Sequence, residues 1–231
     1  MPSRPALRIP TTPRTSPAPS GRRTRADPPV ASGTKQSPAG SLIELVSIVA
    51  VALGLALGIQ AFLVKPFRIP SESMVPALEV GQRVLVDRVS TRFGEADRGD
   101  VMVFKPPQGA DDGVCGRQRA QGTVCASPTK GKSDTNFIKR VVAIEGDRLS
   151  VRRGRVYLNG ELQPEPFIRP SQDCDICNLP RPITIPRDHV FMMGDNRGES
   201  DDSRRWGPVP EEWLIGKAFA TYWPPNRVGG L

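Results

Sequence analysis

The sequence predicts a mostly β protein that is anchored by one apolar helix near its N-terminus. Three observations support this prediction. Residues 45–64 contain no charged side chain, short runs of strand-forming residues recur over residues 82–193, and turn-forming pairs such as Asn159-Gly160 separate some of them. We therefore expect one long helix followed by a domain built from short strands.

The first 40 residues are rich in Pro, Ser, Arg and Gly and show no apolar periodicity. Such a segment buries too little apolar surface to offset the entropy of ordering, so we expect residues 1–40 to be a disordered tail. The tail holds seven basic side chains and one acidic side chain, Asp27. Residues 41–231 hold 25 basic and 23 acidic side chains, so the net charge of +8 does not indicate nucleic-acid binding.

Residues 41–65 form the predicted transmembrane helix. A helix over the 20 uncharged residues 45–64 is about 30 Å long, which matches the hydrocarbon core of a bilayer. The segment is apolar on all sides, unlike a typical core helix, and no small-residue cleavage site follows it, unlike a secretory signal. Because the basic tail precedes the helix, the positive-inside rule places residues 1–40 in the cytoplasm and residues 66–231 outside it.

The extracytoplasmic part has the composition of a β domain. Residues 210–215 are the one candidate for a helical turn, and residues 108–135 are polar, glycine-rich and irregular, so we expect an exposed loop insertion there. We expect strands at residues 82–89, 100–105, 137–144, 180–186 and 190–193, and a hairpin over residues 149–162.

The four cysteines, Cys115, Cys125, Cys174 and Cys177, lie in this extracytoplasmic part. Outside the cytoplasm disulfides are favoured, and the local pairs Cys115–Cys125 and Cys174–Cys177 are the expected connectivity. The C-x-x-C spacing of Cys174 and Cys177 would also suit half of a zinc site, with the other two cysteines as the rest. We expect disulfides and neither a metal nor a cofactor.

The chain has a single histidine, His189, which we expect at the surface or at a strand edge, so a Ser-His-Asp triad is disfavoured. A lysine can replace histidine as the base if its amine is neutral, and burial among apolar groups lowers the amine pKa from about 10.4. Lys139 suits this role, because its neighbours on one strand face are Phe137 and Val141. Ser73 is the candidate nucleophile.

A second serine–lysine pair, Ser127 and Lys130, has the S-x-x-K spacing of penicillin-binding proteins. That spacing requires a helix, so that both side chains share one face. Here the pair lies in the irregular segment 108–135, and no S-D-N or K-T-G sequence follows. We therefore prefer Ser73 and Lys139.

Four segments, in order along the chain, resemble the type I signal peptidases, which are membrane enzymes that remove signal peptides from exported proteins. The segments are P-S-E-S-M-V-P-A-L from residue 70, R-G-D-V-M-V-F-K-P-P from residue 98, I-K-R-V-V from residue 138, and G-D-N-R-G-E-S-D-D-S-R-R-W-G from residue 194. The resemblance covers the apolar helix and most of residues 66–223. It implies a coiled β-sheet or barrel catalytic domain anchored by one N-terminal transmembrane helix.

The resemblance also implies a role for each matching residue. Ser73 would be the nucleophile and Lys139 the general base. Ser71 would donate its hydroxyl to the oxyanion hole together with the backbone N–H of Ser73, and Ser200 would orient the Lys139 amine. A structural charge network would contain Asp195, Arg197, Asp202 and Arg204. An extended substrate, cut after a small-x-small pattern, would occupy shallow apolar pockets lined by Phe67, Ile69, Pro70, Met74, Leu78 and Ile138.

Two departures from the family pattern concern the loops. The insertion at 108–135 widens the gap before the lysine strand, and the stretch before residue 194 is short, so the second β subdomain, at about residues 148–188, should be small. We expect a monomeric, single-pass cell-membrane protein whose partners are exported preproteins and the lipid bilayer, with Tyr222 and Trp223 as candidates for lipid contact. The alternatives are a related peptidase that cleaves one dedicated partner or itself, and a membrane-tethered binding domain without activity. Self-cleaving repressors use a similar serine–lysine pair, but they carry a DNA-binding domain where this chain has its apolar helix.

Overall fold

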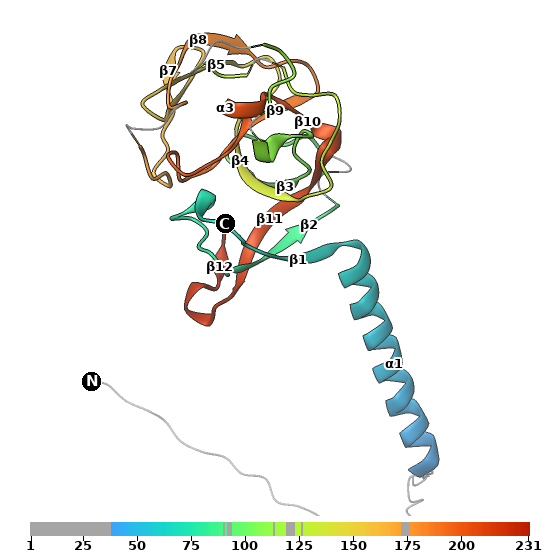
Figure 1. Cartoon of the computed structure of the whole chain (residues 1–231). Coiled ribbons are helices and arrows are strands. Elements are labelled where there is room, and N and C mark those ends of the chain that lie inside the picture. The colour runs from blue at the N-terminus through green and yellow to red at the C-terminus, as the bar shows by residue number, and fades with distance from the viewer. Residues whose placement is uncertain are drawn as a thin grey trace, which may run out of the picture. The chain divides into compact units, whose positions relative to one another are not determined.

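The computed structural model describes residues 38–89, 91, 94–112, 114–118, 123–125, 127–171 and 176–231. These residues contain one long helix, α1 (Pro38–Phe62), and twelve strands, so the predicted mostly β fold is confirmed (Figure 1). All of the strands belong to a compact unit that comprises residues 47–231. Short helical turns connect them: η1 (Glu72–Met74), η2 (Ala110–Asp112), α3 (Ser203–Trp206), η3 (Glu211–Trp213) and η4 (Pro225–Arg227).

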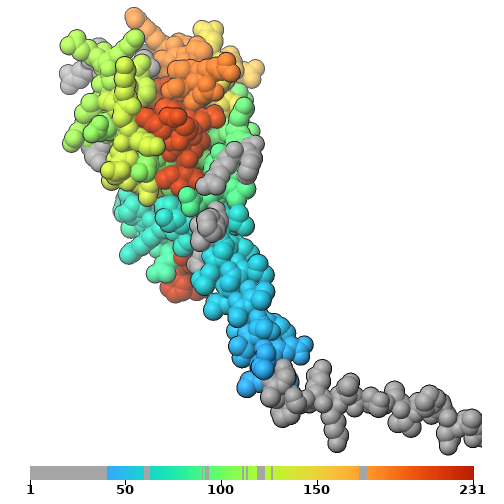
Figure 2. Space-filling model, turned by 90° about the vertical axis from the view of Figure 1, so that its right-hand side faces the viewer, coloured from blue at the N-terminus to red at the C-terminus, as the bar shows by residue number. Residues whose placement is uncertain are grey.

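Helix α1 has the length and composition of a membrane span. Its residues 41–59 are apolar enough to cross a bilayer, and none of them is buried against the rest of the protein. The exposed side chains are mainly Leu, Ile, Val and Ala, and they form the surface of the blue helix in Figure 2. A continuous apolar surface of this length is unfavourable in water and favourable in lipid.

The larger sheet contains eight strands, and every neighbouring pair is antiparallel. Strand β11, from the C-terminal part of the chain, lies between β2 and β3, so the sheet joins residues that are far apart in the sequence. The order is β1 (Val64–Arg68), β2 (Arg83–Asp87), β11 (Leu214–Trp223), β3 (Val101–Phe104), β4 (Phe137–Ala143), β9 (His189–Met193) and β10 (Val209–Pro210), and β12 (Gly229–Gly230) pairs with β11.

The smaller sheet contains β7 (Glu161–Leu162), β6 (Arg155–Leu158), β5 (Arg148–Arg152) and β8 (Leu179–Thr184), in that order. Two-residue turns, Arg153-Gly154 and Asn159-Gly160, join β5 to β6 and β6 to β7, and all four turn residues have positive φ angles. This sheet lies at the end of the unit opposite β1 and β2 (Figure 1).

Three buried clusters hold the unit together. The first joins the two sheets through residues such as Leu149 and Phe191, and the second surrounds the fully buried Trp206. The third packs Ile69 and Met74, which flank residues 70–73, against Ile138 of β4. The third cluster therefore fixes the segment that carries Ser73 beside the strand that carries Lys139.

The helical turn predicted within residues 210–215 is present as the 3-10 turn η3 (Glu211–Trp213), and β11 begins at Leu214. The segment 108–135 is not simply exposed, since Ala110, Val124 and Cys125 are buried. Strand β11 was missed because register shifts interrupt its alternation, and because its partners β2 and β3 lie more than 100 residues earlier in the chain.

Candidate active site

Ser73 and Lys139 meet in the interior of the unit. Ser73 lies on η1, and Lys139 lies on β4, 66 residues later in the chain. The Lys139 Nζ atom is 2.6 Å from the Ser73 Oγ atom, within hydrogen-bond distance. Only 4% of Lys139 and 6% of Ser73 is exposed. The two atoms are therefore placed for direct proton transfer.

Burial determines the charge state of the Lys139 amine. Loss of water is the largest influence on its pKa, which falls from 10.5 to about 8, although the charges of Asp202 and Asp201 oppose the change. The neighbours on the same strand face contribute to this dry surrounding. The Phe137 ring lies 5.5 Å from Nζ, and Val141 is fully buried. An amine with a pKa near 8 is partly neutral at physiological pH and can accept the serine proton.

Backbone and side-chain bonds from Asn196 hold the Ser73 segment on its other side. The Asn196 N–H donates to the Ser73 carbonyl at 3.1 Å, and the Asn196 side-chain amide donates to the Glu72 carbonyl at 3.2 Å. The sequence reasoning did not single out Asn196. Its position inside the G-D-N-R segment was the available signal.

Gly194 is the first residue of the G-D-N-R segment, and Ser200 and the Ser73 carbonyl both lie very close to its Cα atom. An added Cβ atom would lie 2.2 Å from the Ser200 Oγ atom and 2.4 Å from the Ser73 carbonyl oxygen, distances that real structures do not tolerate. A glycine is therefore required for Ser73 and Ser200 to approach the segment as they do.

Asp202 is the centre of the predicted charge network and has no exposed surface. Its carboxylate accepts bonds from the Gly194 N–H at 3.0 Å, from the Ser200 hydroxyl at 2.8 Å and from two nitrogens of Arg204, both at 2.8 Å. Burial alone would raise the pKa of Asp202, but the Arg204 charge and these bonds outweigh burial and lower it. A stable carboxylate therefore fixes both Gly194 and Ser200.

Ser200 differs from the expectation drawn from the resemblance. Its hydroxyl donates to Asp202, and the hydrogen bonds found for Ser200 in the described part of the chain do not include Lys139. The crowding at Gly194 still places Ser200 beside the Ser73 carbonyl. Ser200 therefore influences Lys139 only indirectly in this structure. It hydrogen-bonds to Asp202, and the negative charge of Asp202 acts on the Lys139 amine.

The other two predicted network residues belong to separate ion pairs. Asp195 accepts two bonds from Arg140, at 2.9 and 2.7 Å, and Arg197 pairs with Glu165 at 2.5 Å. Burial raises the pKa of Asp195, and the Arg140 guanidinium opposes that change. Sequence reasoning missed Arg140, the residue after Lys139, and Glu165, because an ion-pair partner far away in the chain leaves no local pattern.

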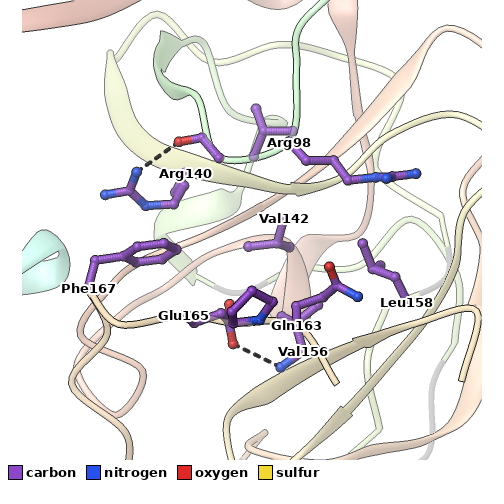
Figure 3. Close-up of a pocket in the computed structure, with 11 residues that line it drawn as sticks. Arg98, Arg140, Val142, Val156, Leu158, Gln163, Glu165 and Phe167 are labelled. Atoms are coloured by element: carbon purple, nitrogen blue, oxygen red, sulfur yellow. Dashed lines mark hydrogen bonds between the residues drawn. The ribbon is translucent and has the colours of Figure 1, made fainter. Parts of the chain in front are cut away.

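These pairs border a small cavity of about 160 Å³ between the two sheets (Figure 3). Arg140 lies over the Phe167 ring, 4.0 Å from its centroid, and also donates to the Gly99 carbonyl. On the opposite wall Glu165 accepts a bond from the Val156 N–H at 3.0 Å. The polar groups named here are all hydrogen-bonded within the protein.

Changing Asp202 to alanine is expected to destabilise the protein by about 3–5 kcal/mol, because it removes the carboxylate from a fully buried ion pair. The thermal denaturation midpoint of the detergent-solubilised protein should fall by roughly 10 °C. Asp201→Ala is the matched control. Asp201 is half-exposed and pairs with the partly exposed Arg205, so its loss should cost less than about 1 kcal/mol. Equal effects of the two substitutions would contradict this assignment.

Apolar residues near Ser73 line an open pocket. Four of the six predicted substrate-pocket residues, Phe67, Ile69, Pro70 and Ile138, meet there. The rest of the lining consists of Arg68, Val103, Asp134, Thr135, Asn136 and Phe137. Met74 and Leu78 do not line this pocket, because they are fully buried in the core cluster behind it. The Ser71 Oγ atom lies 3.2 Å from the Ser73 Oγ atom.

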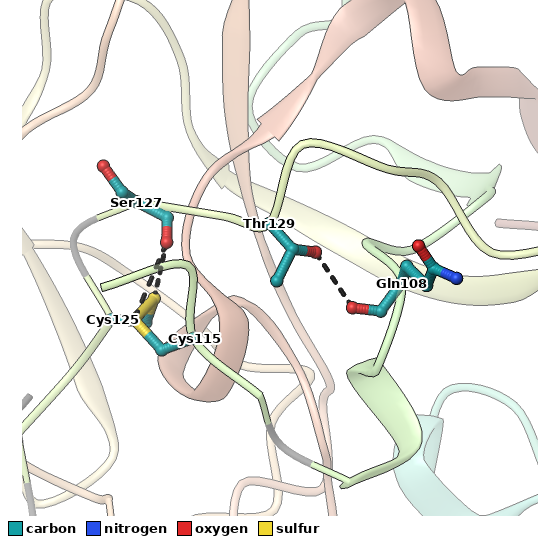
Figure 4. The surroundings of a disulfide bond; sticks show 5 residues. All are labelled: Gln108, Cys115, Cys125, Ser127 and Thr129. Atoms are coloured by element: carbon teal, nitrogen blue, oxygen red, sulfur yellow. Dashed lines mark hydrogen bonds between the residues drawn. A yellow bond between two sulfur atoms is a disulfide. The ribbon is translucent and has the colours of Figure 1, made fainter. Parts of the chain in front are cut away.

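The remaining candidates lie away from this pair. Cys115 and Cys125 form a disulfide next to the Ser127 carbonyl, and Thr129 donates to the Gln108 carbonyl nearby (Figure 4). Cys174 lies outside the described residues, so the pairing of Cys174 with Cys177 stays a prediction.

The described residues contain no group of three or more His, Cys, Asp or Glu side chains that could hold a metal ion. The His189 ring bonds to the Arg187 carbonyl.

Comparisons with known proteins point in one direction. The family described as "Signal peptidase, peptidase S26" matches residues 42–223. A signal peptidase I from Leptolyngbya laminosa is 34% identical over 95% of this chain and 93% of its own length. A probable signal peptidase I-1 from Synechocystis is 38% identical over 84% and 89%, and a signal peptidase I from Pseudomonas aeruginosa is 32% identical over 91% and 83%.

A solved signal peptidase I from Enterococcus faecalis V583 is 19% identical to this chain, with a TM-score of 0.33. The match covers 53% of this chain and 96% of that structure. The family assignment depends on the sequence matches alone.

Proposed function

Because this chain belongs to the signal peptidase family, peptidase S26, we propose that Ser73 and Lys139 are its catalytic pair. Membership makes the protein a serine peptidase whose substrates are exported preproteins with signal peptides. The observation that supports the proposed pair is the 2.6 Å contact between the Lys139 Nζ atom and the Ser73 Oγ atom in a buried site.

The proposed reaction follows from this contact. The neutral Lys139 amine takes the hydroxyl proton as the Ser73 oxygen attacks the scissile carbonyl carbon, and a tetrahedral intermediate forms. The Ser71 hydroxyl and the Ser73 N–H donate to its negative oxygen. The protonated lysine gives its proton to the leaving amine, and an acyl-enzyme remains. Lys139 then deprotonates a water molecule that hydrolyses the ester and frees Ser73.

The pocket and the edge of β4 support an extended substrate. Strand β3 pairs with β4 over residues 137–140, whereas β9 pairs with the other edge only from Arg140 onward. Because the ladder alternates, the Ile138 backbone groups point away from β3, toward that second edge. A peptide strand added there would place its side chains over Phe67 and Ile69, two apolar residues of the pocket lining. This lining and the family membership support our proposal that cleavage follows a small-x-small pattern.

We also propose that α1 anchors a monomer in the cell membrane, with the N-terminus in the cytoplasm and the catalytic unit outside. The apolar surface of α1 and the basic residues before it support this topology. Tyr222 and Trp223 are 37% and 50% exposed, which suits contact with lipid, whereas Trp206 and Trp213 are core residues.

The experiment that tests the proposed function is cleavage of a purified preprotein by the full chain in detergent. Mass spectrometry should find a single cut after an Ala-x-Ala sequence. Preproteins with Phe at either small position should be cut at least about 100-fold more slowly, because Phe overlaps the pocket wall. A preprotein with Phe at the central x position is the control and should be cut normally. Equal rates for all three substrates would contradict the proposed specificity.

The pH dependence of cleavage follows from the lowered pKa of Lys139. Only the neutral amine can accept a proton, and the neutral fraction rises as pH increases through a pKa of about 8. We expect kcat/KM to increase tenfold per pH unit well below pH 8 and to level off above it. A profile of initial rates between pH 6 and about 10, with a substrate that does not titrate in this range, measures this. An activity independent of pH would exclude a titrating lysine base.

A further inference from the structure

The smaller sheet lies at the end of the unit opposite β1 (Figure 1). Three arginines of this sheet line one open pocket. Arg152 ends β5, Arg153 is in the turn, and Arg155 begins β6. Tyr157, Pro170 and Asn178 complete the lining of a pocket of about 620 Å³. None of the three arginines forms an ion pair with a described residue, and the described lining contains no carboxylate.

The positions of Arg152 and Arg155 place two like charges side by side. They are direct cross-strand partners in the β5–β6 ladder, so their side chains project from the same face of the sheet. Like charges at such a pair destabilise a sheet. The Arg152 guanidinium also lies over the Tyr157 ring, 5.0 Å from its centroid, which holds it on this face.

The position of Arg153 breaks a second local rule. Its φ angle is 50°, followed by 75° at Gly154, a pair of left-handed conformations that two-residue hairpins usually fill with Asn-Gly. The next hairpin in the same sheet has this preferred pair, Asn159-Gly160, with φ angles of 54° and 94°. The β5–β6 turn therefore keeps an arginine where an asparagine would be less strained. The like-charged pair and the left-handed arginine both depart from local sequence preferences, and such departures at one place indicate a function for the arginine side chains.

We propose that this pocket binds an anion with two linked phosphate groups. Guanidinium groups bond phosphate oxygens in pairs, so three arginines can engage about six oxygens, more than one phosphate group presents. The anion would separate the like charges of Arg152 and Arg155, and Arg153 would contact it from the turn. The pocket lies at the end of the unit opposite β1, the strand that directly follows α1, so the ligand is a soluble diphosphate and not a lipid headgroup.

Isothermal titration of the full chain in detergent with sodium pyrophosphate tests the proposal. The parent protein should bind pyrophosphate more tightly than inorganic phosphate. Arg153→Asn should weaken pyrophosphate binding by roughly tenfold, since it removes a charged hydrogen-bond donor. The same change should raise the thermal midpoint by about 2 °C, because asparagine fits the left-handed turn better. Lost binding in a more stable variant cannot be attributed to misfolding.

Two further variants and a competition complete the test. Arg155→Gln should also weaken binding about tenfold, whereas Arg187→Gln should have no effect, because Arg187 is an exposed arginine outside the pocket that pairs with Asp188. Failure of the parent to bind pyrophosphate, unchanged binding in Arg153→Asn and Arg155→Gln, or an equal loss in Arg187→Gln would each overturn the proposal. Micelles that contain cardiolipin should not compete with pyrophosphate, and competition by these micelles would overturn the assignment of a soluble diphosphate.

Discussion

Changing Ser73 to alanine is expected to lower kcat/KM for preprotein cleavage by at least about 10⁴-fold, because the variant has no oxygen to attack the scissile bond. Ser73 is buried, and the change removes only one oxygen atom, so the fold should be retained. The neighbouring pocket is unaltered, so binding of an uncleaved preprotein should be within a few-fold of the parent value. Rates under single-turnover conditions, together with a separate binding measurement, distinguish lost chemistry from lost binding.

Ser133→Ala is the control for this experiment. Ser133 lies in the insertion, where its hydroxyl bonds to Thr135 at an exposed position, so the variant should cleave at the parent rate. If the Ser73→Ala protein, freshly purified from cells without a second peptidase, kept more than about 1% of the parent activity, another nucleophile would have to be sought.

Changing Lys139 to methionine is expected to lower kcat/KM by about 10³-fold or more, since the site then lacks a group that can accept the serine proton. Methionine has a similar shape and no charge, and Lys139 is almost fully buried between apolar neighbours. The folded protein no longer has to desolvate an amine, so its thermal stability should be equal to or greater than that of the parent. Opposite changes in activity and stability would be the signature of a functional rather than a structural lysine.

Lys217→Met is the matched control for the lysine substitution. Lys217 lies on β11, is 42% exposed and pairs with Asp100 at 2.6 Å, so its loss should leave cleavage nearly unchanged. The residual activity of Lys139→Met should also lose the rise with pH that is expected around pH 8 for the parent. A variant that kept both the parent rate and the parent pH profile would exclude Lys139 as the base.

Local sequence features predicted a large part of this molecule. The apolar helix followed from composition alone, because the need to match a bilayer is a property of about 20 consecutive residues. Strands β2 to β6, β8 and β9 followed from short strand-like runs and turn signals. The candidates Ser73 and Lys139 followed from the single, poorly placed histidine and from the four family segments. Each of these signals is contained in a short stretch of chain.

Contacts between distant segments were not predictable in the same way. Strand β11 pairs with β2 and β3, Asn196 holds the Ser73 segment, and Asp202 binds Ser200 where a bond to the lysine was expected. The partners Arg140 and Glu165 were missed for the same reason. A local pattern with a period of 2 or 3.6 residues identifies a strand or a helix, but it does not identify the distant segment that each of these residues contacts.

The sequence by itself thus determined which residue types are available for chemistry, the long apolar helix and the strand-rich class of the fold. Only the tertiary structure decided which groups surround the Lys139 amine, and therefore how far its pKa falls. The physical reason is that desolvation depends on every atom packed around a group, and most of those atoms are supplied by segments far away along the chain. Periodicity reports which face of an element is buried, but not what is buried against it.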